Sequence, residues 1–178
     1  DGREDIFCAL QGSNKAALWL QPKAGTFKLN KLTLPQPVGY LAVGDLNGDG
    51  RPDLAAAGSK LVLLNNQGGG RFSSQVYDLG KGAIGQYVAC QDIDGDGKAE
   101  VAVADLGHDS LHFWHNGQLN TISCGYGPWS VEMADADGDG HADVLAPLVR
   151  QSMLLLFWGQ PDGSLSEPDS LVVDPNRP

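Results

Sequence analysis

The stretch DLNGDGRPD, residues 45–53, decides the fold, because it recurs as DIDGDGKAE at residues 92–100 and as DADGDGHAD at residues 135–143. The three copies align without gaps and begin about 45 residues apart, a period typical of repeat architectures. The N-terminal residues DGREDI match the second half of the same motif, with Asp1 at the position of Asp49. The chain therefore contains three complete repeats and one repeat that begins midway through its acidic loop.

Short apolar segments with period-two alternation flank each loop. Tyr, Leu, Val and Ala dominate residues 40–44 and 54–57, and the equivalent segments of the other repeats are similar. Such runs, bounded by Gly and Asp, predict strands rather than helices. Third strands are expected over residues 61–65, 111–115 and 153–158, and fourth strands over 72–79 and 165–173. Each unit is then a four-stranded antiparallel meander of about 40–50 residues, the size of one propeller blade.

The predicted fold is all-β, with three complete β-propeller blades and one blade that lacks its first strand. The complete blades occupy residues 38–80, 86–123 and 129–173, and the incomplete blade occupies residues 1–34. Propellers usually close with about 4–8 blades, and bare strand edges are rare in proteins. We therefore expect further blades, from the same chain or from another chain, to complete the ring.

Oxygen donors alternate along each acidic loop. Positions one, three, five and nine carry side-chain oxygens, and position seven would donate its backbone carbonyl. Carboxylates this close repel one another unless a cation compensates, and the donor set suits calcium better than magnesium, zinc or copper. We predict about three Ca²⁺ sites, formed by Asp45, Asn47, Asp49, Arg51 and Asp53, by Asp92, Asp94, Asp96, Lys98 and Glu100, and by Asp135, Asp137, Asp139, His141 and Asp143.

Two other interpretations of the loops compete with calcium binding. An EF-hand needs a Glu at position twelve and flanking helices, but this sequence has Ala56, Val103 and Ala146 there, inside predicted strands. Solvated Asp-Gly turns without metal are the second alternative. Threefold repetition of the same donor spacing favours metal binding over such turns.

The sequence resembles the FG-GAP/VCBS repeat family, found in integrin alpha-chain heads and in many secreted bacterial proteins. The loops above carry this resemblance, together with the hairpin LLNNQGGGRF at residues 63–72 and a weaker copy, LWLQPKAGTF, at residues 18–27. The resemblance implies a propeller that holds calcium between the first two strands of each blade. Because the first repeat lacks loop positions one and three, Asp1 and Asp5 form only an incomplete fourth site.

Composition excludes several classes of function. The 178 residues include 22 acidic and 12 basic side chains, giving a net charge of −10, which disfavours binding to nucleic acid. No apolar run approaches the ~20 residues that a membrane span needs. No nucleophile elbow, P-loop or zinc-protease motif occurs, so we expect no enzymatic activity.

Histidine, tryptophan and cysteine carry weaker signals. In a strand, His112 and His115 point to opposite faces, so we expect the cluster they form with His108 to have packing or surface roles and no shared metal. Trp129, before an inner strand, is expected to be exposed on one face. The other tryptophans are expected to pack between blades. These tryptophans are Trp19, Trp114 and Trp158. The cysteines Cys8, Cys90 and Cys124 are expected to be buried thiols, and a disulfide between Cys90 and Cys124 is left open.

The sequence therefore favours an extracellular calcium-binding propeller that recognises a protein or a glycan, as in cell adhesion. Two alternatives remain: a non-catalytic propeller segment of a secreted enzyme, and a scaffold subunit completed by a partner chain. A secreted, extracellular or periplasmic location is expected, because calcium sites with dissociation constants of ~10⁻⁴–10⁻³ M fill only where calcium is plentiful.

Overall fold

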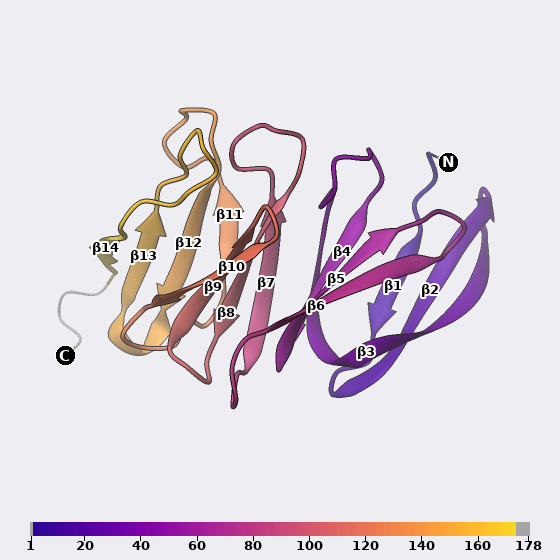
Figure 1. The fold of residues 1–178 in the computed structure, drawn as a ribbon, viewed down its shortest axis with the longest axis horizontal. Helices are drawn as coiled ribbons and strands as arrows, with labels where there is room; N and C mark the ends of the chain where they lie inside the picture. Colours follow the sequence, from indigo (N-terminus) through magenta and orange to yellow (C-terminus); the bar gives the residue numbers. More distant parts are fainter. Residues whose placement is uncertain (1, 174–178) are drawn as a thin grey trace.

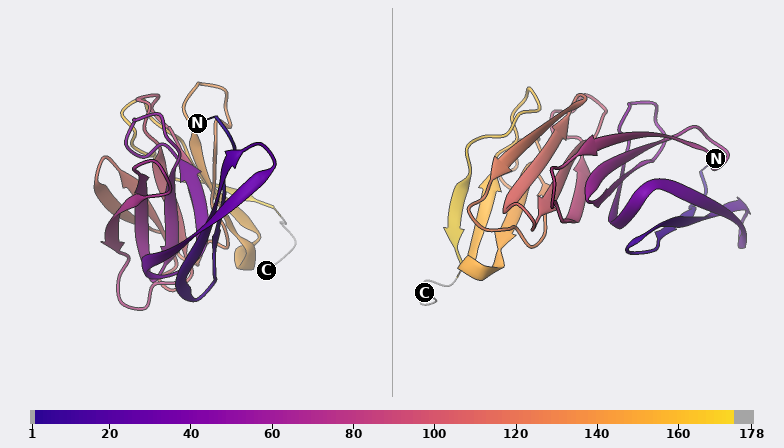
Figure 2. Two further views of the ribbon diagram at one scale, coloured as in Figure 1. Left: turned by 90° about the vertical axis from the view of Figure 1, so that its right-hand side faces the viewer. Right: turned by 60° about the horizontal axis from the view of Figure 1, so that its bottom comes forward.

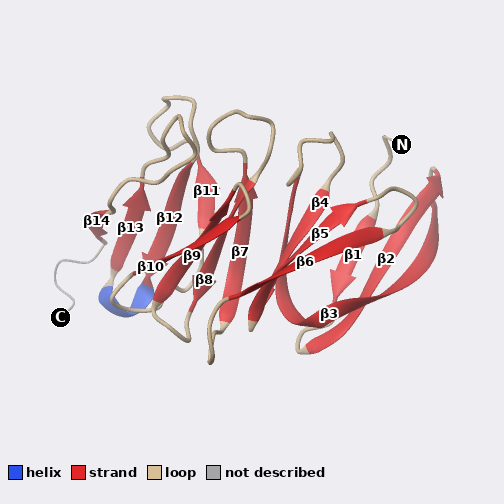
Figure 3. Cartoon of the chain, viewed as in Figure 1, coloured by secondary structure: helices blue, strands red, loops and turns tan. Residues whose placement is uncertain are grey.

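The computed structural model describes residues 2–173, and these residues are almost entirely strand and turn (Figure 3). Within this range no α-helix forms, and one 3₁₀ turn, η1, spans Val149–Gln151. None of the described residues belongs to a helix long and apolar enough to cross a membrane. The strands are β1 (Ile6–Ala9), β2 (Ser13–Lys23), β3 (Thr26–Gly44), β4 (Asp53–Gly58), β5 (Lys60–Asn66), β6 (Phe72–Asp78), β7 (Gly85–Gln91), β8 (Glu100–Asp105), β9 (Ser110–His115), β10 (Gln118–Ser123), β11 (Glu132–Ala134), β12 (Asp143–Leu148), β13 (Met153–Phe157) and β14 (Asp169–Val172).

Three antiparallel sheets stand side by side along the long axis of the molecule (Figure 1). β7 to β10 form one four-stranded meander and β11 to β14 form another, while β1 to β6 form a single six-stranded sheet. The views in Figure 2 show the twist of each sheet relative to the next. The predicted class, all-β with propeller blades, is confirmed.

The six-stranded sheet contains the predicted first and second blades. β3 pairs with β2 from Thr26 to Thr33, with one further pair at Val38, and it pairs with β4 from Val38 onward. Pro35 and Pro37 lie between these stretches, and proline fixes φ near −65°, which suits an extended backbone. The chain therefore passes from one blade to the next without a turn, and the boundary predicted at residues 35–37 falls inside one strand.

The hydrophobic core consists of three clusters, and each cluster lies between two neighbouring blades. In β4, Ala55 and Ala57 pack toward β8 and β9, whereas Leu54 and Ala56 pack toward β2 and the first half of β3. This two-sided burial explains why β4 and β8 are continuous apolar runs. The third cluster joins β8 and β9 to β12 and β13, with Phe157 fully buried.

The inner strands approach one another closely. A Cβ atom on Gly85 of β7 would lie 2.8 Å from the Gly58 carbonyl oxygen at the end of β4. A Cβ atom on Gly44 would lie 2.8 Å from the Ala99 Cβ in the next blade. Glycine is required at both positions because real Cβ contacts are longer, and this spacing lets adjacent blades pack without a gap.

Candidate metal centres

The three acidic loops lie at one end of the sheets, the upper edge in Figure 1. They connect β3 to β4, β7 to β8 and β11 to β12. The carboxylate at position nine begins the second strand of each pair and is buried, with Asp53 at 0%, Glu100 at 2% and Asp143 at 1% exposure. Positions one to seven lie on the loop outside the sheet. The sheets therefore hold one donor rigidly and present the others on a turn.

Backbone N–H groups shape each loop around the carboxylate at position one. Asp45 Oδ1 accepts from Gly48 N at 2.8 Å, and Asp45 Oδ2 accepts from Gly50 N at 2.7 Å. Gly48 and Gly50 have φ of 74° and 78°, a region that glycine enters without steric cost. Asp92 and Asp135 make the same pair of bonds in their own loops. The recurrent Gly-Asp-Gly sequence therefore curls the chain so that side-chain oxygens face one centre.

The carboxylate at position nine closes each loop from below. One of its oxygens accepts the backbone N–H of position two, from Leu46 to Asp53 at 3.1 Å and from Ile93 to Glu100 at 2.9 Å. In the third loop Ala136 N donates to Asp143 Oδ2 at 2.7 Å. These bonds fix where the last carboxylate stands relative to the loop.

The structure brings together some of the predicted donors, in the second and third loops. Among the described residues, Asp92, Asp94 and Asp96 place ligand oxygens within 4.8 Å of one another, as do Asp135, Asp137 and Asp143. In the first loop the Asn47 amide nitrogen lies 3.0 Å from Asp53 Oδ2. Asp139 and Glu100 stand outside these two groups.

The side chains at position seven have roles of their own. Arg51 and Lys98 turn back onto position five, with Arg51 2.6 Å from Asp49 and Lys98 3.1 Å from Asp96. His141 instead bonds through Nδ1 to the Ile93 carbonyl oxygen at 3.1 Å. Donation from their backbone carbonyls to an ion stays a prediction.

The chain alone compensates poorly for the charge of the position-nine carboxylates in the first two loops. Burial raises the pKa of Glu100 to about 7, and the Asp94, Asp92 and Asp96 charges add to the rise against the bond from Ile93 N–H. Burial also raises the pKa of Asp53, with Asp49 and Asp45 contributing. A divalent cation would relieve this repulsion, and an oxygen-rich donor set suits a hard cation. The residues present therefore fit a bound metal ion.

Glu100→Gln is expected to stabilise the calcium-free chain at about pH 8 and to change it little at about pH 5. The pKa of Glu100 in the folded state, about 7, exceeds its usual value of 4.5. Between pH 4.5 and about 7 the folded state therefore binds more protons than the unfolded state, and the free energy of unfolding falls as the pH rises. Glutamine does not ionise, so the variant does not lose this free energy of unfolding at high pH. Melting in EDTA at the two pH values measures it, with exposed Glu132→Gln as control, and equal pH responses in both variants would contradict the assignment.

Hydrogen bonds connect successive loops. Ala99 N in the second loop donates to the Asp45 carbonyl oxygen at 2.7 Å, and Ala142 N in the third loop donates to the Ile93 carbonyl oxygen at 3.4 Å. Each donor is position eight of its loop. The backbone of each of these two loops is therefore hydrogen-bonded to the loop of the preceding blade.

Only one of the two residues of the incomplete fourth site belongs to the described residues. Asp1 lies outside them, and Asp5 Oδ1 accepts a hydrogen bond from Gln21 N at 2.7 Å. Asp5 therefore ties the start of the chain to β2.

Two histidine arrangements were not foreseen. His108 and His112 both bond to the buried Asp105, a pairing that the expectation of no metal shared by all three histidines did not include. His115 lies apart from them, 3.7 Å from Asp94 and 4.0 Å from Glu100. The expected face separation of His112 and His115 is thus correct, but the convergence of the other two depends on strand pairing that periodicity does not reveal.

The remaining sequence expectations have mixed outcomes. Trp114 is buried between blades against Tyr77, and Trp129 is 51% exposed, both as predicted. All three cysteines are free, so the disulfide left open between Cys90 and Cys124 does not form, and Cys8 is exposed rather than buried. The Cys8 expectation fails because Phe7 and Ala9 face the neighbouring core cluster, so Cys8 lies on the other face of the sheet.

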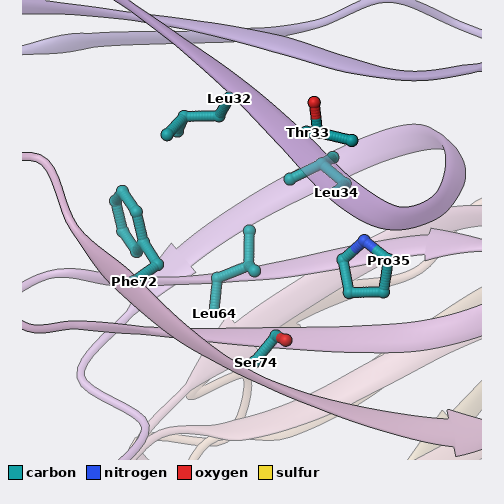
Figure 4. A pocket seen from close by; sticks show the side chains of 7 residues that line it. All are labelled: Leu32, Thr33, Leu34, Pro35, Leu64, Phe72 and Ser74. Atoms are coloured by element: carbon teal, nitrogen blue, oxygen red, sulfur yellow. The ribbon is translucent and has the colours of Figure 1, made fainter.

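A pocket of about 230 Å³ lies between the first half of β3 and the strands β5 and β6 (Figure 4). Leucine, proline and phenylalanine side chains line most of it, and Thr33 and Ser74 contribute hydroxyl groups. It contains no ionisable side chain. The pocket therefore offers apolar contact but no acid–base or metal chemistry.

Known proteins support this fold. No curated protein sequence matches the chain. The periplasmic gluconolactonase PpgL of Pseudomonas aeruginosa is similar in structure, with TM-score 0.64 and 19% identity over 95% of this chain and 51% of that one. BBS1N, in a crystal structure of its complex with ARL6DN, is similar with TM-score 0.58 and 15% identity over 90% of this chain and 46% of that one. The chain thus spans about half the length of each, and the similarity supports the fold alone.

The FG-GAP-like repeat model matches residues 1–56, 45–103 and 92–146. Each match runs from one acidic loop through the next, so the matched unit contains the strands between two successive loops together with those loops. Together the matches cover most of the chain. The chain therefore belongs to the FG-GAP-like repeat family.

Proposed function

We propose that the chain is a calcium-stabilised propeller module that works outside the cytoplasm, extracellular or periplasmic, and recognises a protein or glycan partner. The observation that carries the proposal is the set of three acidic loops at one end of adjacent blades. Each loop combines a buried carboxylate at the start of a strand with further carboxylates on a turn. Calcium is the ion of choice because every side-chain donor is an oxygen. Asp45, Asp92 and Asp135 would begin the three binding loops.

Calcium in this proposal is structural. The loops lie at the seams where one blade meets the next, and the Ala99 to Asp45 hydrogen bond crosses such a seam. An ion that neutralises the carboxylates there would let adjacent loops pack without repulsion. The proposal assigns no catalytic step to the chain.

Recognition is assigned to the opposite end of the sheets. The β6–β7, β10–β11 and β12–β13 connections lie there, and they expose Ile84, Tyr126, Trp129 and Val149, each by half or more. Trp129 N donates to the Pro147 carbonyl oxygen at 2.9 Å, which places this aromatic residue beside β12. Exposed tyrosine and tryptophan are enriched at binding interfaces and stack on sugar rings or protein side chains.

Probing a glycan array and a panel of secreted proteins with the chain tests this assignment. We expect the bound signal to fall at least about tenfold in Trp129→Ala, since exposed aromatic anchors typically contribute 2 kcal/mol or more. EDTA should also abolish it. Phe27→Ala, which removes a half-exposed aromatic residue at the loop end, serves as the matched control. Binding that survives in Trp129→Ala and EDTA would contradict both halves of the proposal.

A further inference from the structure

A second cluster of metal-ligand side chains lies at the end of the third blade away from the acidic loops. Asp105 ends β8, His108 lies in the turn that follows, and His112 lies on β9. Since Glu100 begins β8 at the loop end, the last residue of this strand stands at the opposite end. The cluster is therefore separate from the proposed calcium sites.

Both histidines converge on one oxygen. His108 Nδ1 lies 2.8 Å from Asp105 Oδ2, and His112 Nε2 lies 3.0 Å from the same atom. The three ligand atoms all lie within 4.8 Å of one another. Around a tetrahedral zinc ion with bonds of ~2.0–2.2 Å, neighbouring ligand atoms are about 3.3–3.6 Å apart. The ligands would need to separate by only about half an ångström to admit the ion.

Each ligand is oriented by a second partner. His112 Nδ1 bonds to Thr121 Oγ1 at 2.9 Å, and His108 Nε2 lies 3.2 Å from the Lys81 carbonyl oxygen. Asp105 Oδ1 accepts N–H bonds from Ile84 and Gly107, at 2.7 and 2.8 Å. Metal-binding histidines usually donate the ring N–H that does not face the metal to an oxygen acceptor, which fixes ring orientation. All three side chains are therefore held with their free ligand atoms turned inward.

The burial of the cluster suits a bound ion with one accessible side. The Asp105 side chain is 0% exposed and the His112 side chain is 1% exposed, whereas His108 is 34% exposed. An ion would enter past His108 and take the place of the hydrogen bonds between the ring nitrogens and Oδ2. Water could complete its coordination from the His108 side, as in zinc sites with three protein ligands.

We propose that Asp105, His108 and His112 bind one zinc ion, with Thr121 and the Lys81 carbonyl as its outer partners. Two imidazoles and one carboxylate favour zinc over calcium, which requires six to eight oxygen ligands. Lys81 and Ile84 belong to the segment that carries the chain from β6 to β7. The ion therefore fastens the crossing between the second and third blades to the end of β8.

Calorimetric titration of the chain with Zn²⁺, in saturating Ca²⁺ so that the acidic loops are filled, tests the site. We expect one zinc ion per chain, and shifts in the imidazole ¹⁵N resonances of His108 and His112 but not of His115 or His141. His108→Ala should weaken zinc binding by more than about tenfold, because loss of an outer partner alone typically costs about 10–100-fold. Thr121→Val, which keeps all three ligands, should weaken it by about tenfold.

The controls separate this site from adventitious binding. Cys8→Ser removes the exposed thiol and should leave zinc affinity unchanged. Calcium-dependent melting of His108→Ala should match that of the parent chain, which shows that the variant folds and that the acidic loops are independent. Absence of saturable zinc binding would overturn the proposal. So would full affinity in His108→Ala, or loss of affinity in Cys8→Ser.

Discussion

Removal of calcium is expected to lower the melting temperature of the chain by roughly 10–30 °C. An ion that binds only the folded state stabilises it by about 1.4–2.7 kcal/mol when its concentration is 10–100 times the dissociation constant. Three such sites sum to about 4–8 kcal/mol, and each kcal/mol is worth about 2–4 °C for a chain of this length. Thermal unfolding followed by circular dichroism, in 10 mM Ca²⁺ and then in excess EDTA, measures the shift.

The identity of the ion and its location are tested in the same assay. Excess Ca²⁺ added back should restore the melting temperature, whereas Mg²⁺ should restore little of it, because magnesium requires a smaller octahedral shell. Asp96→Asn, at position five of the second loop, should remove part of the calcium response and leave the rest. A melting temperature that is the same in calcium and in EDTA would show that the loops are metal-free turns.

Phe157→Ala is expected to destabilise the chain by about 3–5 kcal/mol. The Phe157 side chain is 0% exposed, lies on β13 opposite Val144, and fills the cluster between the third and fourth blades. Truncation loses its transfer free energy and leaves a cavity that the rigid sheets cannot close. Urea denaturation measures the loss, and the half-exposed Leu171→Ala on β14 is the control. Equal losses in both variants would contradict the assigned core.

The fold was largely predictable because the repeat carries two kinds of information at once. The spacing of the three acidic loops gives the size of a blade, and the period-two segments around them give its strands. What the sequence did not reveal is the continuity of β3 across Pro35 and Pro37, since both ordinary blade junctions and extended strands contain proline. Only hydrogen-bond pairing distinguishes these two cases.

One candidate site could be predicted from the sequence and the other could not, for the same reason. Asp92, Asp94 and Asp96 lie close in sequence and close in space, so spacing alone predicts their convergence. Asp105, His108 and His112 span a strand end, a turn and a second strand. Their meeting depends on the pairing of Asp105 with Ser110 and on the β6–β7 crossing that supplies Ile84. Local periodicity reveals neither this strand pairing nor this connection. The sequence therefore predicted only packing or surface roles for the histidines.

The placement of the hydrophobic clusters between blades has a consequence for dissecting this protein. Because Ala55 and Ala56 face different neighbours, an excised single blade would expose both of its apolar faces and have no interior of its own. The smallest fragment able to fold autonomously should be a pair of adjacent blades. Chain breaks for fragment expression or circular permutation should therefore leave at least two adjacent blades, with the contact between them intact, on each side of the break.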